Sequence, residues 1–241
     1  MSRRSVRTER RLFLADGPKA VEGALGVPGC VVEVFTTVAG RSLVPAGLPD
    51  DVAVTLVDDR ALAGLSDSVT PAGVVAVCRF VDVDLPAALS GGLVAICADV
   101  RDPGNAGTVV RTADAAGADA VVLAGSSVDL YNPKTLRASV GSAFHLPVAL
   151  APDPLDVVRA AQAAGFTVLA TAADGELALH DPLPAGPTAW LFGNEAHGLP
   201  ADLAAAADHR VSIPIHGRAE SLNLATAAAL CLYESARHRA R

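Results

Sequence analysis

Short apolar runs alternate with helix-like segments along this 241-residue chain, and the alternation limits the folds that it can adopt. Strands that are separated by crossover helices pair in parallel, and helices then cover both faces of the sheet. Hydrophobic residues make up 51% of the chain but aromatic residues only 4%, so the core must be built mainly from Ala, Val and Leu. Both features favour an α/β fold with a parallel sheet. The strands predicted in the C-terminal part cover residues 93–98, 120–123, 166–171, 188–192 and 211–215.

Helices are predicted between these strands. Gly117 and Gly165 end two of them, because glycine is favoured just after the last helical turn. The last predicted helix is rich in Ala and contains no internal Pro or Gly. The predicted helices cover residues 105–116, 134–140, 154–164 and 222–239.

The N-terminal part has a less regular pattern. Its predicted strands cover residues 12–14, 30–35, 52–57 and 74–78, and a helix is predicted over 18–25, which indicates a small α/β sandwich. Residues 81–92 contain Pro, Gly and Asp but few core-forming side chains, so they are predicted to be a linker. The sequence therefore predicts two domains, residues 1–80 and 93–241.

The net charge of −7 argues against a nucleic-acid partner, but the positive charges are clustered at the two ends of the chain. Each cluster is either a solvated tail or a patch that binds phosphate groups, and a basic patch on an acidic protein is compatible with RNA binding. The N-terminal cluster consists of Arg3, Arg4, Arg7, Arg10 and Arg11, and the C-terminal cluster of Arg237, Arg239 and Arg241.

The cysteine pattern gives no sign of a metal site. None of the four cysteines lies within metal-ligand spacing of another, and reduced, buried thiols in a cytoplasmic protein are expected. No apolar run reaches the roughly 18 residues of a membrane span, so no membrane association is expected. The cysteines are Cys30, Cys78, Cys97 and Cys231.

Residues 99–114 follow a predicted buried strand and begin a helix. Pro103 and Gly104 shape the turn, Asn105 is predicted to cap the helix, and Arg111 lies about two turns further on. Helix N-termini attract anions, which would suit a phosphate-bearing ligand, although an ordinary surface loop has the same composition. The segment lacks the third glycine of a dinucleotide-binding GxGxxG motif.

Two later segments also place polar residues after predicted strands. In residues 190–200, Asn194, Glu195 and His197 stand between two glycines, at the strand end where ligands bind in open α/β sheets. A Glu/His pair alone is weak evidence for a metal, and none is expected. In residues 213–226, Ser221 is predicted to cap the last helix, with Asn223 in its first turn.

These three segments, in this order, resemble motifs 1, 2 and 3 of the SpoU/TrmH branch of the SPOUT methyltransferases. The resemblance lies in DPGNAGTVVRTADAAGADAVVL (102–123), LFGNEAHGLP (191–200) and IPIHGRAESLNLATAAALCLYE (213–234), and covers residues 93–236. The N-terminal part resembles, more loosely, the L30e-like substrate-binding domain of some members. That resemblance lies in RLFLADGPKAVEGAL (11–25), where Asp16 departs from the Glu of some members.

The resemblance implies an S-adenosylmethionine-dependent enzyme that methylates a ribose 2′-OH. It implies a trefoil knot that binds the cofactor, and a homodimer in which residues 222–239 form the dimer helix. The N-terminal arginines are expected to bind RNA phosphates. The implied catalytic residues are Arg111, Asn105, Glu195, Ser221 and Asn223, and the backbone at Gly193, Ile213 and Leu222 is implied to hold the cofactor.

The resemblance leaves some questions open. Arg111 is either the base that removes the hydroxyl proton or a clamp that orients the ribose through a phosphate, since arginine resists deprotonation. Large-subunit (23S) rRNA is favoured over tRNA as the substrate, and the role in housekeeping or in antibiotic resistance is open. A nucleotide-binding α/β enzyme of another kind, such as an NAD-dependent one, and a non-catalytic RNA-binding protein of the same fold are the alternatives.

Overall fold

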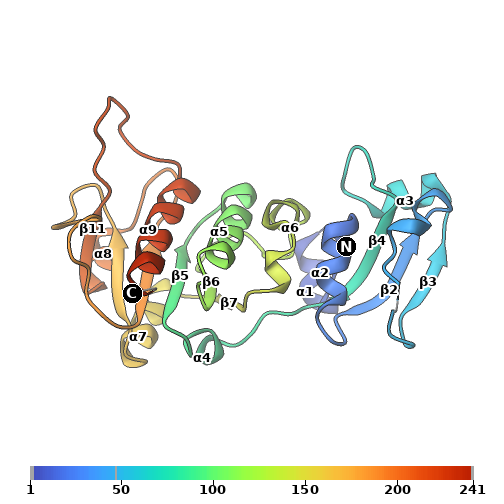
Figure 1. The fold of residues 1–241 in the computed structure, drawn as a ribbon, viewed down its shortest axis with the longest axis horizontal. Helices are drawn as coiled ribbons and strands as arrows, with labels where there is room; N and C mark the ends of the chain where they lie inside the picture. Colours follow the sequence, from blue (N-terminus) through green and yellow to red (C-terminus); the bar gives the residue numbers. More distant parts are fainter. Residues whose placement is uncertain (1–2, 47, 240–241) are drawn as a thin grey trace. The chain divides into compact units, whose positions relative to one another are not determined.

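A computed structural model describes residues 3–46 and 48–239 of the chain, which form two compact units (Figure 1). The first unit contains the residues up to Val81 together with Asp129–His145. The second unit contains Asp82–Val128 and Leu146 onwards. The chain therefore passes between the units three times, at 81/82, 128/129 and 145/146.

The second unit is built on a seven-stranded sheet with the order β7-β6-β5-β10-β8-β11-β9. Every pair of neighbouring strands is parallel, as the alternating pattern predicts. The carboxyl ends of these strands therefore lie along one edge of the sheet. The strands are β5 (Leu93–Ala98), β6 (Ala120–Ala124), β7 (Val148–Ala151), β8 (Thr167–Thr171), β9 (Leu177–Ala178), β10 (Thr188–Phe192) and β11 (His209–Ser212).

Helices cover both faces of this sheet. The even-numbered residues of β5 pack in a core of small aliphatic side chains with α4 (Leu85–Ala88), α7 (Pro154–Ala163) and α8 (Ala201–Ala206). The alternate residues point to the other face, where α5 (Pro103–Ala115) and α9 (Leu224–Arg239) pack side by side (Figure 1). All four cysteines are buried and free, as expected.

The first unit has a four-stranded mixed sheet with the order β1-β4-β2-β3. Its helices α2 and α6 contact β1, and its core includes Phe13, Val34 and Ala76. Its elements are α1 (Arg4–Arg10), β1 (Leu12–Asp16), α2 (Pro18–Leu25), β2 (Val31–Thr36), η1 (Ala39–Leu43), β3 (Ala53–Leu56), α3 (Asp59–Leu65), β4 (Val74–Arg79), α6 (Pro133–Ser139) and η2 (Ser142–Phe144).

A buried ion pair attaches the segment 129–145 to the N-terminal helix. The guanidinium of Arg7 donates from Nε and Nη2 to Oδ2 of Asp129, at 3.0 and 2.6 Å, and both side chains are more than 90% buried. The other carboxylate oxygen of Asp129 accepts the backbone N–H of Tyr131. The Tyr131 ring packs against those of Phe13 and Phe80, at centroid distances of 4.6 and 3.8 Å. The first unit therefore includes a segment that is distant in sequence.

The structure corrects several local predictions. Residues 81–92 contain α4, and Ala88 and Leu89 are buried in the core of the second unit, so this segment is folded rather than a plain linker. Helices α1 and α3 were not predicted, because neither has a strong apolar period in its seven residues. The strand expected over 211–215 ends at Ser212, and its last residues belong to a loop.

We expect Asp129→Asn to destabilise the protein by about 3 kcal/mol, because the isosteric amide removes the negative charge that both Nε and Nη2 of the buried Arg7 contact. The double variant Arg7→Met/Asp129→Asn should recover much of this loss, since neither charge remains. Urea unfolding followed by circular dichroism measures both.

The matched control is Asp156→Asn, which removes an exposed ion pair with Arg159 at 4.0 Å and should cost less than about 1 kcal/mol. Equal unfolding midpoints for Asp129→Asn and the wild type would show that the buried pair does not hold the segment.

Candidate active site

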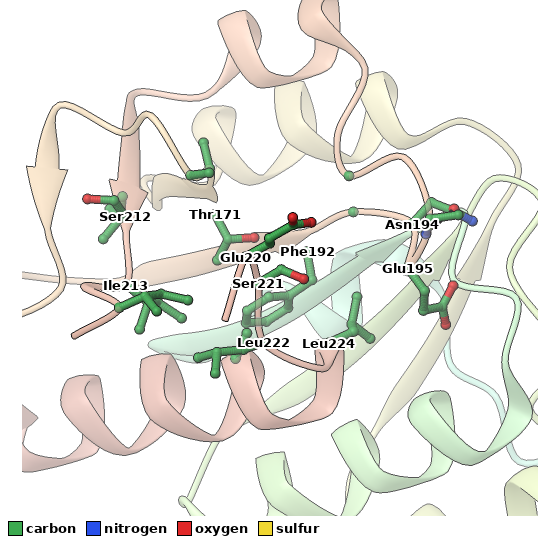
Figure 2. Close-up of a pocket in the computed structure, with 18 of the residues that line it drawn as sticks. Thr171, Phe192, Asn194, Glu195, Ser212, Ile213, Glu220, Ser221, Leu222 and Leu224 are labelled. Carbon is green, nitrogen blue, oxygen red and sulfur yellow. Dashed lines mark hydrogen bonds between the residues drawn. The ribbon is translucent and has the colours of Figure 1, made fainter. Parts of the chain in front are cut away.

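A cavity of about 680 Å³ lies where β8, β10 and β11 end (Figure 2). Parallel pairing places these carboxyl ends together, so three loops that are distant in sequence meet around one space. Ligand pockets for small molecules usually measure roughly 300–1,000 Å³. The lining residues include Thr171, Phe192, Gly193, Asn194, Glu195, Ser212, Ile213, Glu220, Ser221, Leu222 and Leu224.

The loop after β10 is a tight turn that needs glycine at both ends. Backbone hydrogen bonds run in both directions between Asn194 and Gly198, at 3.0 and 2.8 Å. A Cβ atom on Gly193 would lie 2.4 Å from the carbonyl carbon of Gly198, so no side chain fits there. Gly198 has a φ of +67°, which favours glycine. The turn brings Asn194 and Glu195 to one end of the cavity (Figure 2).

Glu195 joins this turn to the N-terminus of α5. Its carboxylate accepts the backbone N–H groups of Arg101 and Asp102, at 3.2 and 3.1 Å, and Nδ2 of Asn105 at 3.2 Å. Asn105 in turn accepts a hydrogen bond at Oδ1 from Nδ2 of Asn223, at 3.0 Å. The structure thus links one predicted site residue from each of the three segments in a continuous hydrogen-bonded chain.

The Glu195 side chain acts in this hydrogen-bonded network as a carboxylate that accepts hydrogen bonds. Partial burial alone raises the pKa of Glu195, but N–H donors outweigh that effect: its own backbone N–H, the Asn105 side chain, and the backbone of Arg101 and Asp102. The net result is a pKa below the ordinary value for Glu. The carboxylate therefore organises the surrounding N–H groups and is poorly suited to accept a proton.

The residues that cap the N-termini of α5 and α9 differ from those that the sequence predicts. Oδ1 of Asp102 accepts the N–H of Asn105, so Asp102 caps α5 and Asn105 lies inside the helix. Oδ1 of Asn223 accepts the N–H groups of Ala225 and Thr226, at 2.9 and 3.3 Å, so Asn223 caps α9 in place of Ser221. Ser221 is left at the cavity wall (Figure 2).

The predicted cofactor residues and Arg111 occupy different places. Gly193, Ile213 and Leu222 all line the cavity. Arg111 lies six residues beyond Asn105 on α5, about 9 Å along the helix axis. Its side chain is exposed, and no hydrogen bond or ion pair ties it to the part of the chain that the structure describes. It is thus available to a molecule in solution.

The N-terminal arginines lie in the first unit, and one of them differs from the rest. Arg3, Arg4, Arg10 and Arg11 are exposed, and the guanidinium of Arg11 lies 4.5 Å from the centre of the Phe80 ring. Arg7 is buried against Asp129 and its charge is compensated there, so it is not placed to contact a phosphate. The other four remain candidates for RNA binding.

Thr171 and Glu220 line the cavity and were not singled out from the sequence. Thr171 ends a predicted strand and Glu220 directly precedes Ser221, so strand ends and motif neighbours were the signals available. Within residues 3–46 and 48–239, no three His, Cys, Asp or Glu side chains are grouped to hold a metal ion. No helix in the same ranges is long and apolar enough to cross a membrane.

Several known proteins are similar to this chain in sequence and in fold. The model of the SpoU rRNA Methylase family matches residues 92–233. The chain is 37% identical over 227 residues to the 23S rRNA (guanosine(2553)-2′-O)-methyltransferase RlmP of Bacillus subtilis (strain 168), with 94% of this chain and 89% of that protein covered.

Solved structures that resemble the chain include two with the cofactor AdoMet, each with a TM-score of 0.85. One is an AdoMet-bound rRNA methyltransferase from Sinorhizobium meliloti, 33% identical, covering 98% of this chain and 91% of that one. The other is the SpoU methyltransferase AviRb from Streptomyces viridochromogenes with the cofactor AdoMet, 31% identical, covering 99% and 94%. The family match spans the three loops that meet at the cavity, and the solved structures share both units, so the chain belongs to the SpoU rRNA methylase family.

Proposed function

We propose that this protein transfers a methyl group from S-adenosylmethionine to a ribose 2′-OH of 23S rRNA. The observation that carries the proposal is the cavity that the second and third family segments line, with the first segment joined to its wall by the hydrogen bonds that link Glu195, Asn105 and Asn223. RlmP and AviRb support the choice of substrate and cofactor, because both resemble the chain over most of its length.

The cavity suits this cofactor in size and in its walls. Its volume of about 680 Å³ falls in the usual range for a small-molecule site, and Gly193, Ile213 and Leu222 lie along its wall. We assign the backbone around Gly193, Ile213 and Leu222 to the adenine and methionine parts of the cofactor. When bound, the cofactor supplies a methyl group on a sulfonium, which is transferred in line to the hydroxyl oxygen. No metal is part of the proposal.

Arg111 is assigned to the RNA. A guanidinium remains protonated in proteins and binds phosphate through two parallel N–H groups. Because the Arg111 side chain is exposed, we favour a clamp that orients the ribose through a neighbouring phosphate over a base. Ser221, at the cavity wall, is assigned to positioning the ribose and the cofactor.

The proposal also covers the assembly and the location of the enzyme. Exposed residues repeat along α9 at helical spacing, and two of them, Leu230 and Tyr233, are apolar and 44% and 53% exposed. This stripe suits a homodimer contact through α9. The trefoil knot, the L30e-like character of the first unit and a cytoplasmic location follow from the family and are proposed with it.

The proposal predicts that labelled methyl from S-adenosylmethionine enters the 23S rRNA band of total RNA from cells that lack this gene. Arg111→Ala should lower the transfer by at least about 100-fold, and Arg111→Lys should fail as well, because lysine lacks the planar fork. The matched control is Arg159→Ala, an exposed arginine on α7, which should transfer at the wild-type rate.

The outcomes separate the alternatives. Label in the tRNA band would support ribose methylation but show that tRNA, not 23S rRNA, is the substrate. Tight RNA binding by the wild-type protein without label in any band would favour a non-catalytic binding protein. Near-normal turnover by Arg111→Lys would exclude both the clamp and the base.

The exposed N-terminal arginines should contribute to RNA affinity through counterion release. We expect Arg3→Gln/Arg10→Gln to reduce the slope of log K against log salt by about 1.4 to 1.8, at roughly 0.7 to 0.9 per phosphate contact. Substitution is preferable to deleting residues 1–11, because deletion would also remove the buried Arg7. Filter binding to an rRNA fragment over a salt series measures the slope.

The control removes two positive charges elsewhere in the first unit, in Arg41→Gln/Arg60→Gln, and should leave the slope nearly unchanged. Equal slopes for both double variants would show that RNA affinity depends on the total charge of the protein and not on the N-terminal arginines in particular.

The dimer assignment predicts that the wild-type protein sediments at twice its chain mass of 24.4 kDa at micromolar concentration. Leu230→Glu should sediment as a monomer, since a charge buried in an interface without a partner is costly. Val69→Glu, at a fully exposed position of the first unit, is the control and should remain a dimer. A monomeric wild type would contradict the assignment.

A further inference from the structure

Asp99 has a backbone conformation that its residue type adopts rarely. It directly follows β5 and has a φ of +55°, in the left-handed region. For residues with a Cβ atom this region is sterically unfavourable, although Asp and Asn tolerate it better than most. Left-handed residues that are not glycine persist where the surroundings hold them, and they are frequent at functional sites.

The loop after β6 holds Asp99 in this conformation. Oδ1 of Asp99 accepts the backbone N–H of Ser126 at 2.7 Å, and the N–H of Asp99 donates to the carbonyl of Ala124 at 3.1 Å. A Cβ atom on Gly125 would lie 2.5 Å from the same Oδ1, so glycine there leaves room for the carboxylate. The Asp99 side chain is thus fixed by its neighbours.

The next residue is held by the same loop. Oγ of Ser127, which is buried, accepts the N–H of Val100 at 3.0 Å, and the N–H of Val128 donates to the carbonyl of Val100 at 2.8 Å. Two consecutive residues of the first family segment are therefore bonded to the loop after β6. Their backbone has little freedom to rotate.

The Asp99 carbonyl is directed at the cavity loop. Nδ2 of Asn194 donates to it at 2.8 Å, and Oδ1 of Asn194 accepts the N–H of Ala196 at 2.9 Å. Asn194 thereby spans the turn that carries Glu195 (Figure 2). Asp99 is not among the residues that line the cavity, and its carbonyl contact with Asn194 is the link to the cavity loop.

We propose that Asp99 is a positioning residue for methyl transfer: its left-handed conformation, fixed by the Ser126 N–H, holds its carbonyl against Asn194 and so sets the position of Glu195. This inference rests on the proposed function. It makes the shape of the cavity depend on a residue outside the cavity wall.

Three substitutions of Asp99 distinguish the contribution of the left-handed backbone conformation from that of the side-chain hydrogen bond to Ser126. Asp99→Asn keeps an oxygen acceptor for Ser126 and tolerates positive φ. Asp99→Gly allows the conformation but has no acceptor, and Asp99→Ala lacks the acceptor and strains the backbone. The experiment measures kcat at saturating S-adenosylmethionine and rRNA, at least 20 °C below the Tm of each variant, so that all are folded.

We expect kcat within about twofold of wild type for Asp99→Asn, lower by severalfold for Asp99→Gly, and lower by about tenfold or more for Asp99→Ala. The effect should disappear in an Asn194→Ala background, where Asp99→Ala should lower kcat no further, because the two residues act in series.

Two results would overturn the proposal. A merely structural role would lower the Tm of Asp99→Ala and leave kcat unchanged. An equal loss with and without Asn194 would show that Asp99 acts by another route. Failure of the proposed function is distinguishable, because the wild-type protein would then transfer no methyl to rRNA.

Discussion

The parallel pairing of β5, β8, β10 and β11 is the constraint on which the rest of the site depends. A parallel sheet places the carboxyl ends of its strands along one edge. The segments after β5, β10 and β11 leave the sheet at that edge, although the ends of β5 and β11, Ala98 and Ser212, are 114 residues apart in sequence. The sheet itself is held by small aliphatic side chains on the face that α4, α7 and α8 cover, and by larger side chains such as Trp190 on the face that α9 covers, so the chemistry is confined to loops that the core does not need.

Meeting at an edge does not by itself give a site, because free loops would lose the required geometry. Here the loops are tied by polar groups with specific partners. Glu195 collects three N–H groups from the start of α5, and Asn105 passes the connection on to Asn223 at the start of α9. Since α5 and α9 also pack together, the hydrogen bonds join elements that the core has already placed. Positioning of this kind removes most of the motional freedom before a substrate binds.

The sequence was informative where local periodicity decides the structure. The strand over Thr188–Phe192 and the helix over Pro18–Leu25 match their predicted ranges, because each has a clear apolar pattern and clear ends. Capping was predicted less well. Asp102 and Asn105 are both good caps, and Pro103 at the first helical position decides for Asp102. Three-dimensional relations were not accessible: nothing in the composition of residues 129–145 indicates that Asp129 pairs with Arg7, 122 residues earlier.

The same limitation explains why the sequence did not predict a role for Asp99. In sequence it is a polar residue between a strand and a proline-containing turn, which is an ordinary composition for a loop. Its importance lies in a dihedral angle and in two hydrogen bonds to residues 27 and 95 positions away. The loop that holds it, Gly125–Val128, is also where the chain leaves the second unit to form the segment 129–145. Within the second unit, a displacement of that loop would act on the cavity through Asp99 and Asn194.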